Sequence, residues 1–307
     1  MKVLSGPPSG WTVDRRTATA IGVFDGMHIG HQAVVRATTV DGLLLPAVLT
    51  FSTHPATVLA PEGEPPQLST LEQRLEYLEA EDVAIVALVE FDEPFRLLSP
   101  GKFVEAYLVA GLNAGNVSVG SDFRFGHNAA GTVATLEQLG LDRGFDVRSI
   151  DPVVVGGHEV RSSRIRELVA SGDVVRAAAL LGHPYAVRGV VIRGEGRGRS
   201  IGIPTANLEP AAVVALPAEG VYAVTVSLDG EWHDGVANLG HRPTFDGSEE
   251  ILEAHIFDFD GDLYGREVDI AFIERIRDER RFESIDALVG QIERDITEAR
   301  KRLGRAS

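Results

Sequence analysis

Cysteine is absent from this 307-residue sequence, which excludes disulfides, thiolate metal sites and a cysteine nucleophile. No apolar run approaches the roughly 20 residues that a membrane-spanning helix needs. Residues 1–8 are too short and too broken by proline to form a signal peptide. The remaining composition, 44% hydrophobic and 24% charged, is that of a globular protein long enough for two domains. We therefore expect a cytoplasmic protein.

Positive charge is also scarce. Arginine and lysine total 29 against 45 aspartates and glutamates, a net charge of −16 that argues against a nucleic-acid or membrane partner. Lysine occurs only at positions 2, 102 and 301, and the phosphate loop G-x-x-x-x-G-K-[ST] is absent. Any phosphate chemistry must therefore rest on arginine, histidine, backbone N–H groups and a metal ion.

The first half of the chain alternates short apolar runs with helical patterns. Four runs are predicted to be buried strands: 18–24, 46–51, 83–91 and 116–120. Helical spacing appears over 71–80 and again over 100–112, where Ser99-Pro100 provides an N-cap residue and a first-turn proline. This alternation predicts a doubly wound parallel sheet with helices on both faces and ligands at the carboxyl ends of the strands.

The pattern changes near residues 182–185. Beyond this point the apolar segments are short, alternating and separated by glycine, with an Asp-Gly hairpin signal at 229–230. Three strands and a long final helix are predicted at 221–228, 252–259, 267–273 and 284–302. We therefore predict two domains, 1–183 with the parallel sheet and 184–307 with a small antiparallel β-barrel and a C-terminal helix.

Two histidines flank a glycine where the first strand turns into a helix, in the segment 21–31. A helix N-terminus presents N–H groups and positive potential, and glycine lets the backbone approach a phosphate closely. We prefer this interpretation to an incidental surface turn, and to a two-histidine metal site that lacks a third ligand nearby in sequence. The candidate phosphate-binding residues are Gly22, Phe24, Asp25, Gly26, His28 and His31.

A second predicted helix start, at residues 160–166, places hydroxyl groups beside arginines. Ser162, Ser163 and Arg166 suit the triphosphate of ATP. Taken alone, they slightly favour simple capping of a surface helix.

A glycine- and arginine-rich loop precedes the segment Pro-Thr-Ala-Asn at 204–207. Alternating glycines can present N–H groups to phosphates, and the oxygens of Thr205 and Asn207 suit Mg²⁺ bound to ATP. The candidate ATP-binding residues are Gly194, Gly196, Gly198, Arg199, Gly202, Pro204, Thr205 and Asn207. A flexible connecting loop explains the glycine–arginine run equally well, and the Pro-Thr-Ala-Asn segment that follows favours the phosphate-binding interpretation.

The histidine and serine–arginine segments resemble the H-x-G-H and S-[ST]-x-x-I-R motifs of the nucleotidyltransferase superfamily. Segments 50–55 and 120–126 narrow the resemblance to the FMN adenylyltransferase module of bacterial bifunctional FAD synthetases. The resemblance implies that His28, His31 and Arg166 are catalytic residues serving ATP. It also implies flavin contacts for His54, Asp122, Phe123, Arg124 and Phe125.

Two departures from that family are visible. Ser52-Thr53 stands where an acidic residue and proline are usual. Ser163 stands where threonine is commoner, a change that keeps the hydroxyl.

The second half resembles the riboflavin kinase module, in which P-T-A-N binds Mg-ATP. The resemblance continues through 235–245, 252–257, 262–265 and 276–282. It implies that Glu253 is the catalytic base for the riboflavin 5′-hydroxyl, although the residue pattern alone favours a solvent-facing strand position. It implies flavin contacts for Arg242, Pro243, Thr244, Arg277 and Phe282.

Together, the two motif sets predict a bifunctional enzyme that phosphorylates riboflavin to FMN and adenylylates FMN to FAD, releasing pyrophosphate. Riboflavin, FMN and ATP are the expected small-molecule partners, Mg²⁺ the expected metal, and FMN and FAD the product ligands. Three alternatives are an enzyme with one active half, a non-catalytic flavin carrier, and a nucleotidyltransferase for a pantetheine or pyridine substrate. Self-association is left open.

Overall fold

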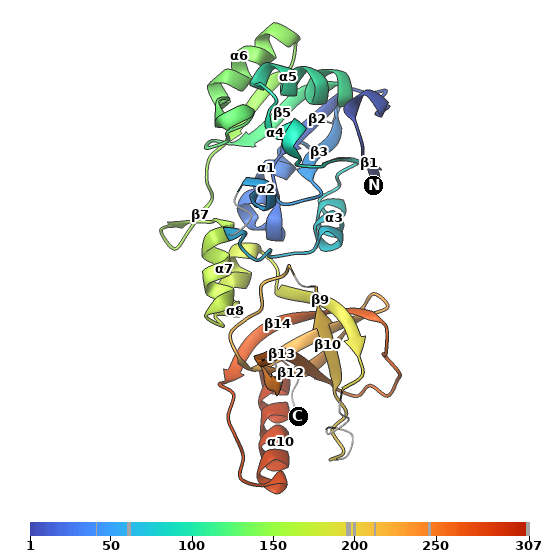
Figure 1. The fold of residues 1–307 in the computed structure, drawn as a ribbon, viewed down its shortest axis with the longest axis vertical. Coiled ribbons are helices and arrows are strands. Elements are labelled where there is room, and N and C mark those ends of the chain that lie inside the picture. Colours follow the sequence, from blue (N-terminus) through green and yellow to red (C-terminus); the bar gives the residue numbers. More distant parts are fainter. Residues whose placement is uncertain are drawn as a thin grey trace. The chain divides into compact units, whose positions relative to one another are not determined.

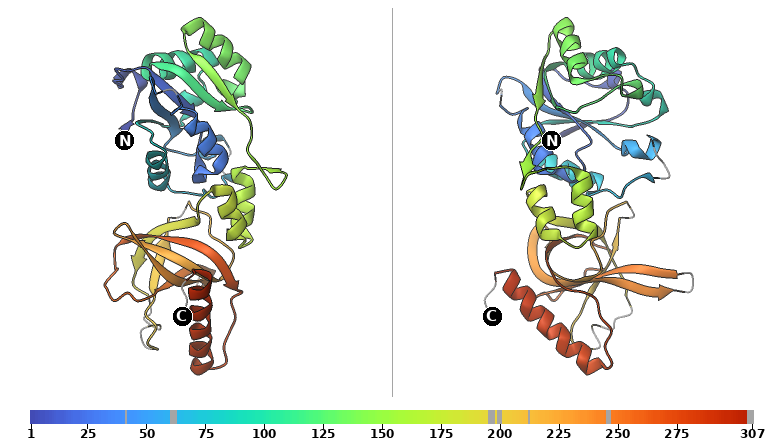
Figure 2. Two further views of the ribbon diagram at one scale, coloured as in Figure 1. Left: turned by 180° about the vertical axis from the view of Figure 1, so that it is seen from behind. Right: turned by 90° about the vertical axis from the view of Figure 1, so that its left-hand side faces the viewer.

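The computed structural model describes residues 1–40, 42–59, 63–194, 198, 201–211, 213–244 and 247–304, with the backbone alone at 242–244 and 247–250. The chain divides into two compact units, one made of residues 1–65 and 71–161 and the other of 66–70 and 162–307. Figures 1 and 2 show a sheet with helices in the first unit and a barrel in the second.

The first unit is built on a six-stranded parallel sheet, which confirms the predicted fold. Its strand order is β1-β4-β3-β2-β5-β6, and every neighbouring pair is parallel. The strands are β1 (Lys2–Leu4), β2 (Thr17–Ile21), β3 (Leu45–Phe51), β4 (Ile85–Val89), β5 (Ala114–Gly120) and β6 (Asp146–Ile150).

Both faces of this sheet are buried. Successive residues of a strand point to opposite faces, and Leu49 belongs to one hydrophobic cluster while Val48 belongs to another. The order of the strands reverses beside β2, because β3 and β4 follow on one side and β5 and β6 on the other. Such a reversal opens a crevice at the carboxyl ends of the strands, where ligands bind.

The helices and smaller strands of this unit connect and cover the sheet. They are η1 (Pro8–Gly10), η2 (Asp25–Met27), α1 (Ile29–Arg36), α2 (Pro55–Leu59), α3 (Leu71–Ala80), α4 (Glu93–Arg96), α5 (Pro100–Phe103), η4 (Val104–Gly111), η5 (His127–Ala129), α6 (Val133–Arg143), β7 (Val154–Val155) and β8 (His158–Glu159).

The segment predicted as one helix over 100–112 has two parts. After α5 the chain continues as the π-helix η4, and the N–H of Leu112 bonds to the carbonyl oxygen of Tyr107, five residues back, at 2.9 Å. The Tyr107 ring stacks on Phe103 and meets Phe95 edge-on. The sequence pattern predicted a helix over this segment but did not distinguish a π-helix from an α-helix.

The second unit contains a closed six-stranded barrel, ordered β10-β13-β12-β11-β14-β9. This confirms the predicted antiparallel β-barrel. Asp229 and Gly230 both have positive φ, 52° and 86°, so they form the predicted two-residue hairpin turn between β11 and β12. The elements are α7 (Ser162–Ala170), α8 (Val174–Leu181), β9 (Tyr185–Ile192), β10 (Ala206–Pro210), β11 (Gly220–Leu228), β12 (Glu231–Thr244), β13 (Gly247–Ile256), β14 (Glu267–Arg277) and α10 (Ile285–Arg302).

The final helix α10 begins where Ser284 caps it by accepting from the N–H of Ala287. The division by contacts groups α7 and α8 with the barrel, since α8 lies against β14 and β9. The predicted boundary between residues 183 and 184 stays a prediction.

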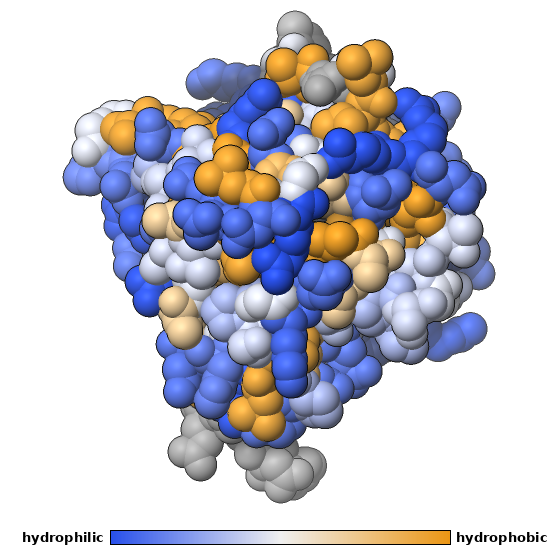
Figure 3. Space-filling model, turned by 90° about the horizontal axis from the view of Figure 1, so that it is seen from above, coloured by the Kyte–Doolittle hydropathy of each residue, from blue (hydrophilic) through white to orange (hydrophobic). Residues whose placement is uncertain are grey.

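Among the described residues, none of the helices has the length and apolarity to cross a bilayer. Hydrophilic and apolar residues are interspersed over the face seen in Figure 3.

Candidate active sites

The turn after β2 presents the histidine pair at the start of α1. Phe24 and Gly26 have positive φ, 56° and 73°, so the chain reverses tightly before His28. His28 is the N-cap of α1, and its Nδ1 accepts from the N–H of His31 at 3.1 Å. Because Nδ1 is the acceptor, the proton of the neutral ring lies on Nε2, which is then a donor.

The two imidazoles form one stacked unit. Their ring centroids are 3.5 Å apart with 16° between planes, and the buried Phe24 ring meets His31 edge-on at 5.4 Å. Side-chain atoms at Gly22 and Gly30 would crowd these rings, since an added Cβ would lie 2.9 Å from Phe24 and 3.1 Å from His28. The glycines therefore permit the packing that fixes both histidines beside a helix N-terminus.

The predicted second phosphate segment does start a helix. Ser162 and Ser163 are the first residues of α7, and Arg166 lies in its second turn. The Nε of Arg166 donates to the carbonyl oxygen of Pro66 at 2.7 Å. These residues belong to the second compact unit, whereas His28 and His31 belong to the first.

An aromatic cavity of about 490 Å³ lies at the carboxyl ends of the parallel strands. Gly22 follows β2, Phe51 ends β3, Phe91 follows β4 and Phe123 follows β5, so the strand reversal brings them together. Of the residues predicted to bind flavin, Phe123, Arg124 and Phe125 line it, and the Phe123 and Phe125 rings are stacked at 5.4 Å. Four lining rings were not predicted: Phe51, Phe91, Phe95 and Phe103. Phe51 and Phe91 could have been found from one signal, a phenylalanine at the end of a predicted buried strand, whereas Phe95 and Phe103 lie on helices.

Two predicted flavin residues lie outside the lining of this cavity. His54 accepts from the N–H of Ala56 at 3.1 Å and so shapes the start of α2, whose Pro55 does line the cavity. Asp122 pairs with Arg161 at 3.5 Å. Arg124 donates twice to the carbonyl oxygen of Ala129, which fixes the loop of the stacked phenylalanines.

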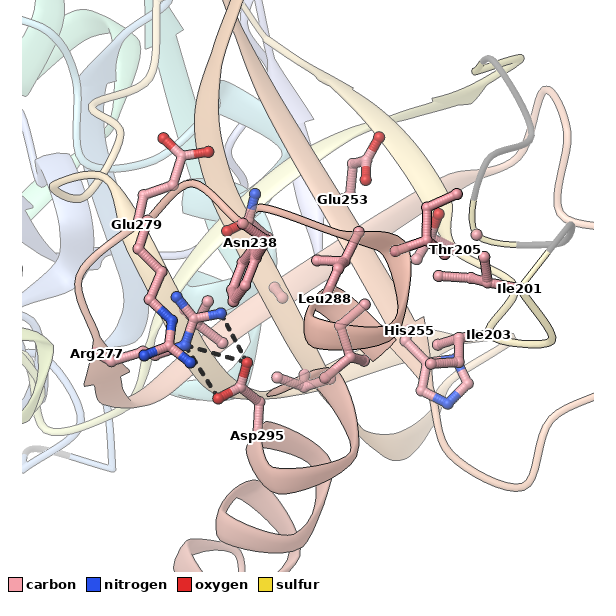
Figure 4. A pocket seen from close by; sticks show the side chains of 18 of the residues that line it. Ile201, Ile203, Thr205, Asn238, Glu253, His255, Arg277, Glu279, Leu288 and Asp295 are labelled. Carbon is pink, nitrogen blue, oxygen red and sulfur yellow. Dashed lines mark hydrogen bonds and ion pairs between the residues drawn. The ribbon is translucent and has the colours of Figure 1, made fainter. Parts of the chain in front are cut away.

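A second cavity, of about 770 Å³, is bounded by barrel strands and by α10 (Figure 4). Residues expected to bind ATP and those expected to bind flavin meet in its wall. Asn207 of β10 and Glu253 of β13 are direct register partners, and Glu253 is half-buried. The predicted residues that line it are Gly198, Thr205, Asn207, Glu253, Arg277 and Phe282, and the Arg277 guanidinium lies 5.8 Å from the Phe282 ring.

A third cavity, of about 550 Å³, also adjoins Thr205, which directly precedes β10. It is lined by Pro204, Arg193 and Tyr264, and the Arg193 guanidinium lies 5.0 Å from the Tyr264 ring. Thr205 thus belongs to the walls of two cavities. This arrangement can hold two molecules whose reacting ends meet near Thr205.

Several predicted positions have other outcomes. Gly196 and Arg199 lie outside the described residues, as do the side chains of Arg242, Pro243 and Thr244, whose backbones form the end of β12. Gly194 and Gly202 do not line either barrel cavity. A Cβ added at Gly194 would collide with the Asn207 side chain, so this glycine permits a close approach.

No cluster of three or more His, Asp or Glu side chains able to hold a metal occurs in the part of the chain that the structure describes. Thr205 and Asn207 instead place neutral oxygen donors in the wall of one cavity with the Glu253 carboxylate. This donor set fits Mg²⁺, which keeps waters and phosphate oxygens and needs few protein groups.

Comparisons with known proteins agree with this division into two sites. The FAD synthetase family model matches residues 11–164, and the riboflavin kinase family model matches residues 181–303. The bifunctional riboflavin kinase/FMN adenylyltransferase of Bacillus subtilis is 38% identical over 292 residues, covering 92% of each chain. That of Haemophilus influenzae is 39% identical over 304 residues, covering 98% of each.

Among solved structures, a Streptococcus pneumoniae protein described as a macrolide-efflux protein matches with a TM-score of 0.88 and 33% identity. The match covers 96% of this chain and 97% of that one, which shows that the whole two-part fold is shared. Its description differs from those of the curated relatives, and the family models, which match each half separately, agree with the relatives.

The fold and sites define a two-part, ATP-using enzyme that combines a kinase with a nucleotidyltransferase. The chain belongs to the family of bifunctional riboflavin kinase/FMN adenylyltransferases, whose two activities make FMN and FAD. The predicted family, enzyme class and pair of activities are confirmed.

Proposed function

We propose that the two reactions are divided between residues 1–183, which adenylylate FMN, and residues 184–307, which phosphorylate riboflavin. The observation that carries this proposal is that Glu253, Thr205, Asn207 and Arg277 line one cavity although they come from widely separated segments. The family models support the same assignment, because each matches one side of this division almost entirely.

At the barrel, the flavin occupies the larger cavity and ATP the adjoining one. Arg277 and Phe282 then contact riboflavin, and Thr205 lies where the two molecules meet. Glu253 accepts the proton of the 5′-hydroxyl as that oxygen bonds to the γ-phosphorus, and the bond to the bridging oxygen of ADP breaks. Arg242, Pro243 and Thr244 are proposed to complete the flavin site.

Mg²⁺ is proposed to bind through Thr205 and Asn207, where it would neutralise charge on the ATP phosphates. The preceding segment is proposed to hold the phosphates through the backbone N–H groups of Gly194, Gly196, Gly198 and Gly202 and the guanidinium of Arg199, with Pro204 shaping the turn. A cytoplasmic location is also proposed, because both reactions consume ATP.

At the parallel sheet, the aromatic cavity holds the isoalloxazine ring of FMN. Stacked phenylalanines offer it flat apolar faces. The FMN phosphate attacks the α-phosphorus of ATP, and pyrophosphate leaves. The groups proposed to stabilise the charge are the Nε2–H of His28, His31, the N-terminus of α1, and Ser162, Ser163 and Arg166, with Phe24, Asp25 and Gly26 shaping the turn.

Two substitutions test this division of labour. Glu253→Gln should abolish FMN formation from riboflavin but leave added FMN convertible to FAD. His28→Ala should slow FAD formation at least about a hundredfold while FMN still accumulates, because charge stabilisation is usually the largest catalytic contribution. A mass-spectrometric time course with riboflavin, ATP and Mg²⁺ follows both products. Loss of both reactions in either folded variant would refute the assignment.

A further inference from the structure

His255 lines the flavin-side cavity of the barrel and has no role in the mechanism above. It lies two residues beyond Glu253 on β13, and residues i and i+2 of a strand share a face. Figure 4 shows Glu253, His255, Thr205 and Ile203 around the same cavity. The position therefore places an imidazole beside the segment that carries the metal-binding candidates.

The side chain of His255 links β13 to the segment before β10, just beyond the last residue pair of these two strands. The ladder between β10 and β13 runs from Leu208 to Ala206, which is partnered with Ala254. The next position along this register would set Thr205 opposite His255, and Pro204 beyond it has no N–H to donate. The Nδ1 of His255 lies 2.8 Å from the carbonyl oxygen of Pro204.

This hydrogen bond fixes the direction of donation. A carbonyl oxygen only accepts, so Nδ1 carries the proton and donates to Pro204. The bond ties β13 to the backbone immediately before Thr205. On the other side of Pro204, the turn is closed by the N–H groups of Ile201 and Ile203, which donate to the carbonyl oxygen of Gly198 at 3.2 and 2.9 Å. Pro204 is thus held between a closed turn and a histidine.

The imidazole itself is held by packing. Its ring meets the buried Phe257 ring edge-on at a centroid distance of 5.8 Å. The guanidinium of Arg300, from α10, lies 4.5 Å from the Phe257 ring and pairs with Asp258. A ring packed in this way keeps its orientation, so its Nδ1–H can act as a fixed anchor.

We propose that His255 is a positioning residue for phosphoryl transfer: its Nδ1–H holds the Pro204 carbonyl so that the Thr205 hydroxyl keeps its place against the metal and phosphates of ATP. This inference rests on the role proposed above for Thr205. Displacement of a positioned group by about 1 Å costs up to about a hundredfold in rate. The loss of this single hydrogen bond should therefore affect the kinase reaction far more than the fold.

Three substitutions distinguish the effect of the hydrogen-bond donor at position 255 from the effect of side-chain size. His255→Leu removes the donor, His255→Asn places an amide N–H near the position of Nδ1, and His255→Gln carries its donor one bond farther out. His255→Leu should lower kcat/KM for ATP about tenfold or more, with KM for riboflavin changed less than about twofold. His255→Asn should recover activity to within about threefold, and His255→Gln should not.

A matched control is available on the same barrel. His233 makes a similar edge-on contact, with Phe259 at 5.8 Å, but does not line the cavity. His233→Leu should leave the kinase reaction unchanged. FAD formation from added FMN, measured on the same preparations, should be unaffected in every variant, and an unfolding midpoint equal to that of the parent should show that the barrel is folded. Full kinase activity in His255→Leu, or equal losses in the Asn and Leu variants, would overturn the inference.

A double-mutant cycle with Thr205→Val tests whether His255 acts through Thr205. If it does, His255→Leu should cause little further loss in the Thr205→Val background, because the hydroxyl that it positions is already gone. Independent, multiplying losses would overturn the inference. The same variants distinguish the role proposed for Thr205 from the role proposed for His255. Normal kinase activity in Thr205→Val would refute the proposed function. An inactive Thr205→Val variant together with a fully active His255→Leu variant would refute only the role of His255.

Discussion

Asp295 of α10 holds Arg277 of β14 through both carboxylate oxygens. Arg277 Nη2 donates to Oδ2 at 2.7 Å and Nε donates to Oδ1 at 3.0 Å (Figure 4). Gln291 also donates to Oδ1. The Asp295 side chain is only 5% exposed. The C-terminal helix therefore fixes the guanidinium that faces the proposed flavin cavity.

Asp295→Asn should raise KM for riboflavin about tenfold, because Arg277 loses its bidentate salt bridge and with it a fixed orientation. The free energy of unfolding should fall by about 2–3 kcal/mol, the scale of a hydrogen bond to a charged group. Steady-state kinetics and calorimetric unfolding measure the two effects. Glu293→Gln, at an exposed site on the same helix, is the control and should change neither. An unchanged KM would show that Arg277 does not contact the flavin.

Gly30→Ala should impair FAD formation without weakening the fold. The added Cβ would lie 3.1 Å from the His28 ring and displace it, while alanine favours a helix over glycine by about 1 kcal/mol. FAD formation from added FMN should fall about ten- to a hundredfold, with the kinase reaction and the unfolding midpoint retained. Gly10→Ala, where an added Cβ meets open space, should behave as the parent. Normal FAD formation in Gly30→Ala would contradict a role for the His28 position.

Phe123→Ala should weaken binding of FMN to the parallel-sheet unit. The ring stacks on Phe125 at an interplanar angle of 11°, and removing it takes away one apolar face of the cavity. A loss of about 1–1.5 kcal/mol corresponds to a roughly tenfold rise in KM for FMN. Leu97→Ala serves as control, because Leu97 is exposed and does not line the cavity. Equal effects of the two substitutions would place the flavin elsewhere.

Arg74 should be a principal source of stability in the first unit. Its side chain is 1% exposed, and its Nη1 donates to the carbonyl oxygen of Phe51 at 2.9 Å. Burial lowers the pKa of Arg74, and the nearby carboxylates of Asp25 and Glu72 oppose that shift. Arg74→Met would leave the buried Asp25 charge without this partner, at a cost of about 3–5 kcal/mol.

The Arg74 prediction is best measured by urea unfolding in a Trp232→Phe background, where Trp11 is the single tryptophan and reports the first unit. Adding Asp25→Asn should restore part of the loss. Arg143→Met, which breaks a more exposed pair with Glu105, should cost less than about 1 kcal/mol. If the Arg74 and Arg143 variants lost equal stability, the buried charge would not be the cause.

The sequence predicted four of the six parallel strands, three of the six barrel strands and the final helix, because local signals agree with the fold at these elements. Continuous Val, Ile, Leu and Ala runs indicated strands buried on both faces, and Asp229-Gly230 fixed a two-residue hairpin. Ser284 marked the start of α10. The π-helix over Val104–Gly111 carries no such signal in the sequence. An α-helix and a π-helix have similar residue compositions, and tertiary packing decides which of the two forms.

For this protein, the sequence by itself determined the family, the two halves and the residue types available for phosphate chemistry, because contiguous motifs and the near-absence of lysine can be read along the chain. The tertiary structure decided which distant residues share a cavity. The pairing of Asn207 with Glu253, the return of Asp295 onto Arg277 and the convergence of phenylalanines from separate strands all depend on strand order and register. Register and strand order are set by the packing of the whole core, and no local pattern records them.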